Sequence, residues 1–188
     1  MARQIQHLRS GGRIISDSHI LKTNTLCRLT NVCFSSVFFD RFLQLNDIKT
    51  RVDHETKATY SKFWIDAADA HNIAIDDEVV EVSELDKIVN KDDLDDHLVD
   101  LDLESDLQNV QNLTTAVFKD KVMDLFRVRR KMKENMAVSG THDSDPWNFV
   151  DIAIQFVKVP YMTKFAAYYF YKRCEEHSEV DASFQPFM

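Results

Sequence analysis

The stretch RVRRKMKENMAVSGTHDSDPWNFV, residues 127–150, decides the fold of this 188-residue chain. Its first half is basic, with apolar residues at helical spacing, and it ends at Ser139-Gly140, a typical helix C-cap because glycine readily adopts left-handed backbone angles. Its second half starts a new helix, with Asp145 as the N-cap and Pro146 at the first helical position, where its missing N–H costs no hydrogen bond. The stretch therefore predicts a helix, a polar turn and a second helix.

The helical pattern extends in both directions from this turn. The basic helix begins at Thr114 or Thr115, either of which is a suitable N-cap. The helix that starts at Trp147 is apolar nearly all round until Pro160 ends it, so we expect it to be buried. A last helix is expected over residues 162–176, where aromatic residues recur at helical spacing. Three consecutive helices are thus predicted at the C-terminal end.

Two further helices are predicted nearer the N-terminus. The first starts after Ser36 and carries apolar residues at positions 37–39, 42, 43 and 45. The second is capped by Asp53 or Thr56 and keeps helical spacing of aromatic and alanine residues up to Asn72. The segment that follows, residues 73–80, is predicted to be a short strand or a loop.

We predict an all-α fold of two small helical units joined by an acidic, partly ordered connector. Only three Gly and three Pro occur in the chain, and such scarcity favours helices over a turn-rich β-sandwich. The predicted segments are a poorly ordered N-terminal segment (1–35), an N-terminal helical unit (36–80), the acidic connector (81–113) and a C-terminal helical unit (114–188). The first segment lacks a clear hydrophobic period, and a targeting presequence or a mispredicted gene start are the alternatives for it.

Charge is strongly segregated along the chain, whose net charge is −8. Residues 61–110 carry sixteen Asp/Glu against three Lys/Arg, whereas residues 111–137 carry seven Lys/Arg against three Asp/Glu. Two hypotheses follow: the basic helix binds nucleic-acid phosphates, or it pairs with the acidic segment 84–106 of the same molecule. The candidate nucleic-acid-binding residues are Lys119, Lys121, Arg127, Arg129, Arg130, Lys131 and Lys133.

No arrangement of residues reaches a catalytic or metal-binding signature. His142, Asp143 and Asp145 cluster in the turn, and His177 and Cys174 lie downstream, but none of the usual zinc spacings occurs. We therefore assign a structural role in the turn to Gly140, Asp143, Asp145, Pro146 and Trp147. The chain also has no nucleophile elbow and no glycine-rich phosphate loop. We expect a protein that is not an enzyme and that uses no cofactor and no metal.

The three cysteines and the absence of long apolar runs bear on location. Cys27, Cys33 and Cys174 are an odd number without paired CxxC spacing, which favours buried thiols in a reduced, intracellular compartment. No apolar run approaches the roughly 18 residues that a membrane-spanning helix needs. We expect no membrane partner.

Two stretches carry a family resemblance: NDIKTR (46–51) with Phe63-Trp64, and SGTHDSDPWNF (139–149) with Tyr168-Tyr169 downstream. Together they resemble a multicopy family of oomycete and protist proteins with this type of turn after a basic helix. That family is similar in layout to Myb/SANT-like, trihelix-type domains that are often associated with transposable elements. The resemblance implies DNA as a partner and a nuclear location. The chain departs from the Myb pattern because it lacks regularly spaced tryptophans.

The function expected from the sequence is a non-enzymatic, nucleic-acid-associated binding module that uses the basic face of helix 115–138. The resemblance implies that this module is Myb/SANT-like and transposon-derived. The alternative is a protein–protein interaction or structural module whose basic helix pairs with its own acidic segment. In that alternative, a protein partner docks on the aromatic C-terminal helices.

Overall fold

A computed structural model describes residues 17–45, 54–73, 84–89, 94, 110–140, 145–177 and 180 of the chain. Within these ranges the chain forms helices α1 (Asp17–Phe34), α2 (Phe39–Gln44), α3 (His54–Asn72), the 3-10 helix η2 (Glu84–Asp86), α5 (Thr115–Ser139), α6 (Trp147–Val157) and α7 (Lys164–Glu176). No strand occurs in these ranges, and the fold is all-α, as the sequence predicts.

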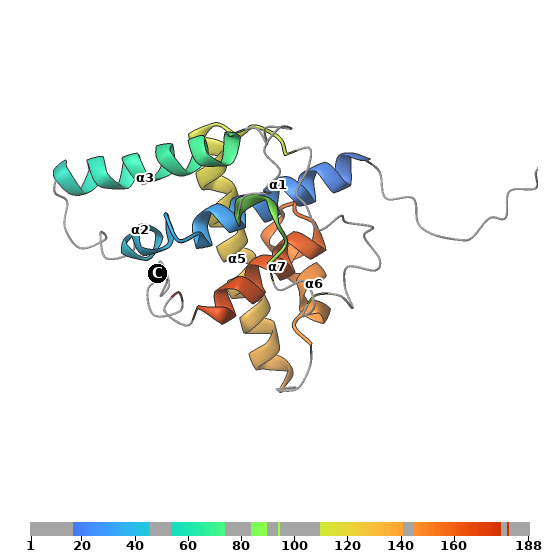
Figure 1. Ribbon diagram of the computed structural model, residues 1–188. Coiled ribbons are helices and arrows are strands. Elements are labelled where there is room, and N and C mark those ends of the chain that lie inside the picture. The colour runs from blue at the N-terminus through green and yellow to red at the C-terminus, as the bar shows by residue number, and fades with distance from the viewer. Residues whose placement is uncertain are drawn as a thin grey trace, which may run out of the picture.

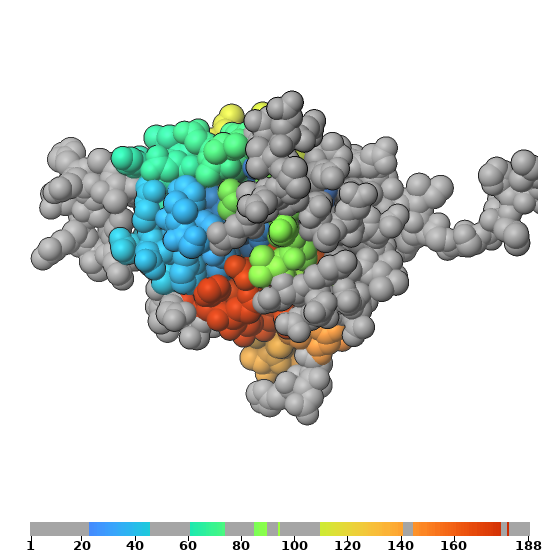
Figure 2. All heavy atoms as spheres, viewed as in Figure 1, coloured from blue at the N-terminus to red at the C-terminus, as the bar shows by residue number. Residues whose placement is uncertain are grey.

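Helix α5 lies at the centre of the fold and contacts α1, α3, α6 and α7 (Figure 1). Helix α1 crosses it and also contacts α2, α3, α7 and η2. In the space-filling view of Figure 2, α1 and α2 lie between α3 on one side and α7 on the other. After the turn at the end of α5, α6 packs back along α5 at the edge of the molecule.

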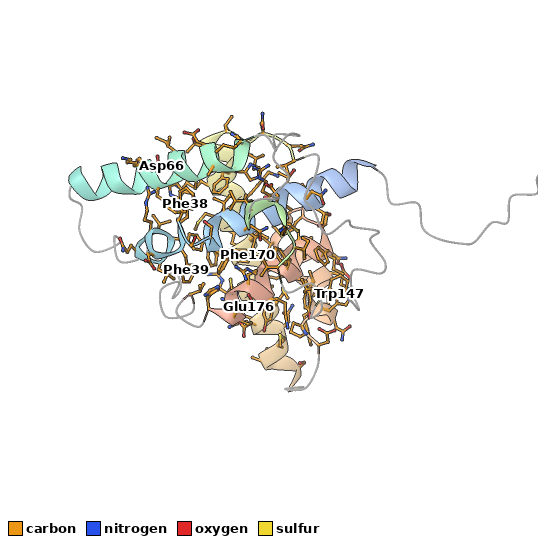
Figure 3. All side chains as sticks on the ribbon, in the orientation of Figure 1. Phe38, Phe39, Asp66, Trp147, Phe170 and Glu176 are labelled. Atoms are coloured by element: carbon orange, nitrogen blue, oxygen red, sulfur yellow. The ribbon has the colours of Figure 1, made fainter. Side chains whose placement is uncertain are left out.

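Aromatic side chains of α2, α3, α5 and α7 meet in one core. Phe42 of α2 stacks on Phe126 of α5 at 5.8 Å between ring centroids, and Phe126 meets Phe170 of α7 edge to face at 5.0 Å. The ring centroids of Trp64 in α3 and Phe118 in α5 lie 6.3 Å apart. Phe170 lies near the centre of the side-chain view in Figure 3. Among the described residues, helices that were expected in different units therefore share this core.

The largest departure from the sequence-based prediction is α1. Residues 17–34 form a helix, and Leu29, Val32 and Cys33 are each 0% exposed. The prediction that residues 1–35 are poorly ordered is thus wrong from residue 17 onward, while residues 1–16 lie outside the described part. The reason is that polar residues of α1 are buried as well, so the helix is enclosed on several sides and shows no apolar stripe.

Several helices and caps match their predictions. The Thr114 hydroxyl accepts a hydrogen bond from the Val117 N–H at 3.4 Å, and α5 ends at Gly140 with φ +65°. The Asp145 carboxylate accepts the Trp147 N–H at 2.9 Å, but α6 begins at Trp147 with Pro146 in the N-cap position, one residue later than predicted. These ends agree because capping depends on neighbours along the chain.

Other predictions fall wholly or mostly outside the described residues. Residues 74–80, expected to form a strand or loop, belong to this group. Of the predicted connector, residues 84–89, 94 and 110–113 are described, and Ile88, Leu94 and Leu113 are buried. Among the described helices, none is both long enough and apolar enough to cross a membrane.

Candidate functional surface

The seven basic residues predicted to bind nucleic acid do not share one face of α5. Arg129 is 6% exposed, and its guanidinium pairs with Glu175 of α7 at 2.8 Å. Lys133 reaches the same carboxylate oxygen at 3.0 Å. The Arg129 guanidinium also lies 5.9 Å from the centre of the Tyr171 ring. Arg129 and Lys133 therefore join α5 to α7, which gives them a structural role.

Two lysines of α5 lie over aromatic rings, one in α6 and one in the segment between α6 and α7. Lys121 places its Nζ 4.1 Å from the centre of the Tyr161 ring, and Lys131 places its Nζ 4.2 Å from the centre of the Phe156 ring. Such cation–π contacts contribute about 0.5–1 kcal/mol each at exposed sites. The pKa of the Tyr161 hydroxyl is raised, first by burial and second by the hydrogen bond that this hydroxyl donates to Asp124. These lysines thus cover aromatic rings of the adjoining segment.

The outward face of α5 carries Arg127 and Arg130, whose side chains are 59% and 54% exposed. Arg127 pairs with Asp124, and the Arg130 Nε lies 3.9 Å from Glu134. Lys131 contacts Glu134 as well, at 3.1 Å. Exposed pairs within one helix are weak, about 0.3–0.5 kcal/mol each, so these two arginines remain accessible to an anion. Lys119, the last of the seven, is partly exposed near the start of α5.

The described part of the acidic segment 84–106 makes a different ion pair. Asp86 lies 3.2 Å from the Nε of Arg28 in α1, and both side chains are 5% exposed. Within the described residues, Arg127, Arg130 and Lys131 pair with acids of α5 itself, and Arg129 and Lys133 both pair with Glu175 of α7. Most of the acidic segment lies outside the described residues, so its pairing with the basic helix stays a prediction.

The predicted structural turn is described in part. Gly140 adopts φ +65°, and Asp145 accepts a second hydrogen bond, from the Tyr168 hydroxyl at 3.4 Å. Burial and then Asp145 raise the pKa of Tyr168 to about 12. Trp147 meets Tyr168 edge to face at 5.2 Å, and Pro146 is half-buried. Asp143, with Thr141 and His142, lies outside the described residues.

Helix α6 is far more exposed than its composition predicts. Only Val150 and Ala153 are buried, whereas Ile152 is 57% and Phe156 is 66% exposed. The prediction that α6 is buried is therefore wrong, because α6 packs at the edge of the fold against α5 and α7 and nothing described covers its outer side. Phe149, Ile152 and Phe156 follow i, i+3, i+7 spacing and so lie along one helix face. We call these three residues the α6 stripe.

Polar groups border the α6 stripe on both sides. On the side of α5 lies Lys131, whose ammonium group covers one face of Phe156. On the other side, Asn148, Asp151 and Gln155 are exposed at the same helical spacing as the stripe. Asp151 is paired with Lys164 of α7 at 2.9 Å. The surface is thus an apolar line with a polar rim, the composition of many protein-binding surfaces.

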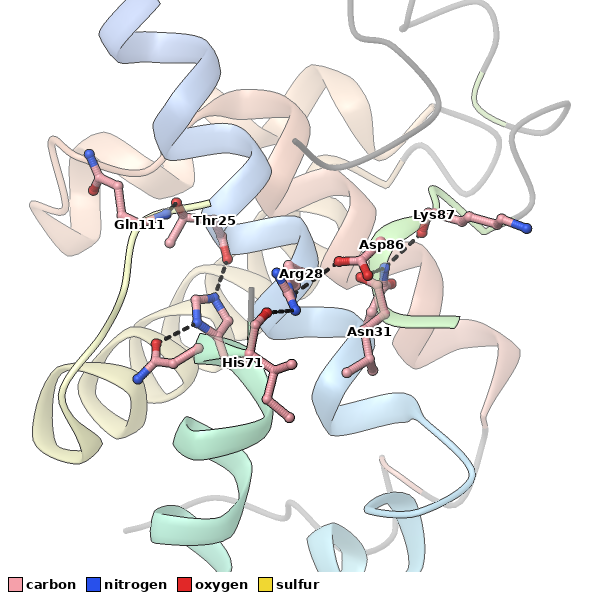
Figure 4. A network of polar contacts seen from close by, with 10 residues as sticks. Thr25, Arg28, Asn31, His71, Asp86, Lys87 and Gln111 are labelled. Carbon is pink, nitrogen blue, oxygen red and sulfur yellow. Dashed lines mark hydrogen bonds and ion pairs between the residues drawn. The ribbon is translucent and has the colours of Figure 1, made fainter. Parts of the chain in front are cut away.

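A buried polar network, which sequence patterns did not reveal, fixes α1 in place (Figure 4). Arg28 pairs with Asp86 and also donates to the carbonyl of Ile73 at 2.5 Å. Asn31 donates to the carbonyls of Leu85 and Lys87 at 3.0 and 2.7 Å. Each of these contacts joins α1 to a segment more than 40 residues away. The network therefore has a structural role, since it satisfies polar groups that burial would otherwise leave unpaired.

Tyr169 and His71 complete this network from α7 and α3. The Tyr169 hydroxyl donates to Asn31 at 2.6 Å and accepts the Val89 N–H at 3.1 Å. His71 is 0% exposed, and its Nε2 lies 3.1 Å from the carbonyl oxygen of Thr25. Burial lowers the pKa of His71 below its usual 6.5, against the opposing effect of its hydrogen bonds with the Thr25 carbonyl and the Asn72 side chain. The imidazole is thus held neutral inside the fold.

No cluster of three metal-binding side chains occurs among the described residues. His177 packs on the rings of Phe34 and Phe39, at centroid distances of 5.4 and 4.5 Å. Cys174 is buried, as are Cys27 and Cys33, whose thiol pKa values are raised by burial. His177 and Cys174 therefore act as packing groups.

Comparison of the chain with protein-family models, with curated proteins and with solved structures finds no match. The resemblance to the oomycete and protist family accordingly stays a prediction. A binding surface is therefore inferred only from the exposure and contacts of the α5 and α6 side chains.

Proposed function

We propose that the protein is a helical interaction module that binds another protein through the α6 stripe. The observation that carries the proposal is the exposure of Ile152 and Phe156, which are 57% and 66% accessible in a helix, α6, whose residues are mostly apolar. Large apolar side chains that gather on one exposed face mark interaction sites more often than isolated ones do. The function is that of the alternative expected from the sequence, a partner on the C-terminal aromatic helices.

The chemistry of the stripe suits docking of an apolar segment. An aromatic side chain that is buried at the centre of an interface contributes strongly to binding, and Phe156 is already held in place by the Lys131 contact at 4.2 Å. Burying the exposed parts of Phe149, Ile152 and Phe156 removes apolar surface from water, at about 25 cal/mol per Å². The polar rim of Asn148, Asp151 and Gln155 supplies hydrogen-bonding groups at the edge.

The test is a substitution of the stripe with a matched control. Phe156→Glu places a charge in the stripe, whereas Val37→Glu places one at a residue that is 70% exposed and lies before α2. Both variants and the wild-type chain are cross-linked in cell extract, and the bound proteins are identified by mass spectrometry. We expect a partner shared by wild type and Val37→Glu and lost from Phe156→Glu. The same proteins on all three chains would contradict the proposal.

A second candidate is contact with nucleic acid through the outward face of α5, as the sequence and the Myb/SANT-like resemblance imply. The observation in its favour is that Arg127 and Arg130 are 59% and 54% exposed on one face. Against it stand the burial of Arg129 and the net charge of −8, which repels a polyanion.

Gel-shift titration at low and moderate salt tests this second candidate. Binding through phosphate contacts weakens steeply as salt rises, and each lost contact lowers the slope of log K against log salt by about 0.9. We expect Arg127→Ala with Arg130→Ala to lower that slope, while Lys62→Ala, an exposed control on α3, leaves it unchanged. Absence of any shift at low salt would remove the candidate, and the nuclear location that goes with it.

A further inference from the structure

We infer that the partner seated on the α6 stripe is a second copy of this chain, with the two α6 helices packed antiparallel across a two-fold axis near Ile152. This inference rests on the docking function proposed for α6. A two-fold interface requires a surface that is complementary to itself, because the same patch is present on both copies. The pattern of α6 meets that requirement in its apolar residues, its polar rim and its charges.

The apolar residues are arranged almost symmetrically about Ile152. Phe149 lies three residues before it and Phe156 lies four residues after it. When two α6 helices run antiparallel and cross at Ile152, Phe149 of one copy meets Phe156 of the other, and the two Ile152 side chains approach each other. Each of the two Phe149–Phe156 contacts is an aromatic pair, which contributes beyond the area it buries.

The polar rim has the same symmetry. Asn148 and Gln155 lie four residues before and three residues after Ile152, and both are exposed. The antiparallel arrangement brings Asn148 of one copy near Gln155 of the other, where their side-chain amides can donate to and accept from each other. The rim therefore offers matched hydrogen-bonding groups at both ends of the stripe.

Charge does not oppose this arrangement at its centre. Asp151 lies next to the proposed axis, so two copies would bring two aspartates together, and like charges in contact repel. Each Asp151, however, is paired with Lys164 of its own chain at 2.9 Å, which compensates the negative charge. At the edge facing α5, Lys131 lies over Phe156. The stripe is thus free of excess negative charge in a chain of net charge −8.

The other strongly exposed apolar residues lie on other elements. Val37 precedes α2, Ile65 is in α3, Ile73 directly follows α3, and Val117 and Val138 lie near the two ends of α5. None of them belongs to a run at helical spacing on its own element comparable to Phe149, Ile152 and Phe156. Among the described residues, the α6 stripe is therefore the surface best suited to face itself.

Sedimentation equilibrium of the full chain, from about 1 µM to about 1 mM, spans the affinity range of weak to moderate dimers. We expect the mass to rise toward that of a dimer with concentration. Ile152→Glu, which places two carboxylates beside the axis, is expected to leave the chain monomeric, while the control Ile65→Glu, at a 47% exposed position on α3, dimerises as the wild type does. A wild-type chain that stays monomeric at the highest concentration overturns the inference.

Cysteine cross-linking tests the antiparallel orientation. The native cysteines are buried, so an added surface cysteine reacts selectively. Ile152→Cys is expected to form a disulfide-linked dimer under mild oxidation, and a mixture of Phe149→Cys with Phe156→Cys is expected to cross-link between the two variants more than within either. Cross-linking mainly within each variant would indicate parallel helices and refute the arrangement, as would equal cross-linking of an Ile65→Cys control.

The two proposals fail in different ways. If the wild-type chain is monomeric but Phe156→Glu still loses a partner that the wild type captures, the docking function stands. The partner on the α6 stripe is then not a second copy of the chain. A dimer that resists Ile152→Glu forms through another surface and also overturns the inference. Capture that is the same for all variants contradicts the docking function itself.

Discussion

The buried ion pair between Arg28 and Asp86 provides the sharpest test of the fold. The two side chains are each 5% exposed, with 3.2 Å between the Nε and the carboxylate oxygen. Asp86→Asn keeps the size of the side chain and removes its charge, so Arg28 stays buried without its counter-ion. Breaking a buried pair from one side costs about 3–5 kcal/mol. We expect about 3 kcal/mol, the lower end of this range, because the Asn side chain keeps a polar oxygen near the guanidinium.

Urea denaturation followed by circular dichroism measures this loss. With a slope of about 2 kcal/mol per M, the midpoint is expected to fall by about 1.5 M. The matched control is Asp66→Asn, since Asp66 pairs with Arg41 at 2.8 Å but the two side chains are 33% and 36% exposed. A partly exposed pair contributes about 0–1 kcal/mol, so this control is expected to shift the midpoint by less than about 0.5 M.

A double variant separates the charge from the packing. Arg28→Met with Asp86→Leu removes both charges, so neither remains buried alone, and we expect it to be more stable than Asp86→Asn. Equal midpoints for Asp86→Asn and Asp66→Asn would refute the assignment of Arg28 and Asp86 to the interior. Such a result would mean that the segment 84–89 is not held against α1.

Three further predictions concern the turn, acid stability and the thiols. Gly140→Ala should lower the free energy of unfolding by about 1–2 kcal/mol in thermal melts, because φ is +65° even though open space surrounds the Cα. Burial lowers the pKa of His71 from 6.5, so as pH drops below about 6.5 the unfolded chain binds a proton before the folded chain does, and the free energy of unfolding should fall. The slope of this free energy against pH is at most about 1.4 kcal/mol per pH unit for one group, and His71→Gln should reduce it. An unchanged slope in the variant would contradict the prediction. Since burial raises the pKa of the Cys27 and Cys33 thiols, a thiol reagent at neutral pH should label them only after urea unfolds the chain; rapid labelling of native protein would show that they are accessible.

Local signals in the sequence were sufficient for the ends of the central helices. Thr114, Gly140 and Asp145 act on backbone groups within three residues of themselves, so their effects can be read without knowledge of the fold. The scarcity of Gly and Pro correctly predicted the all-α class, because these residues interrupt helices through the local backbone, whatever the fold.

Helix α1 could not be predicted from periodicity because its burial depends on partners distant in the chain. Arg28 and Asn31 are inside only because Asp86 and Tyr169 arrive from segments about 60 and about 140 residues later. Without those partners a Ser-, Thr- and Asn-rich segment resembles a solvated one. The candidate surface was missed for the converse reason, since the apolar content of α6 predicted burial and its position at the edge of the fold left one face exposed.

The sequence by itself determined where α5 begins and ends, that the protein is all-α, and that charge gathers in blocks. Only the tertiary structure decided which side chains face inward: Arg129 is 6% exposed against Glu175 while Arg130, the next residue, is 54% exposed by its side chain. The physical reason is that helix formation is governed by residues within one turn, whereas burial depends on which helices pack alongside. That packing placed Ile152 and Phe156 of α6 on the outside and α1 in the core.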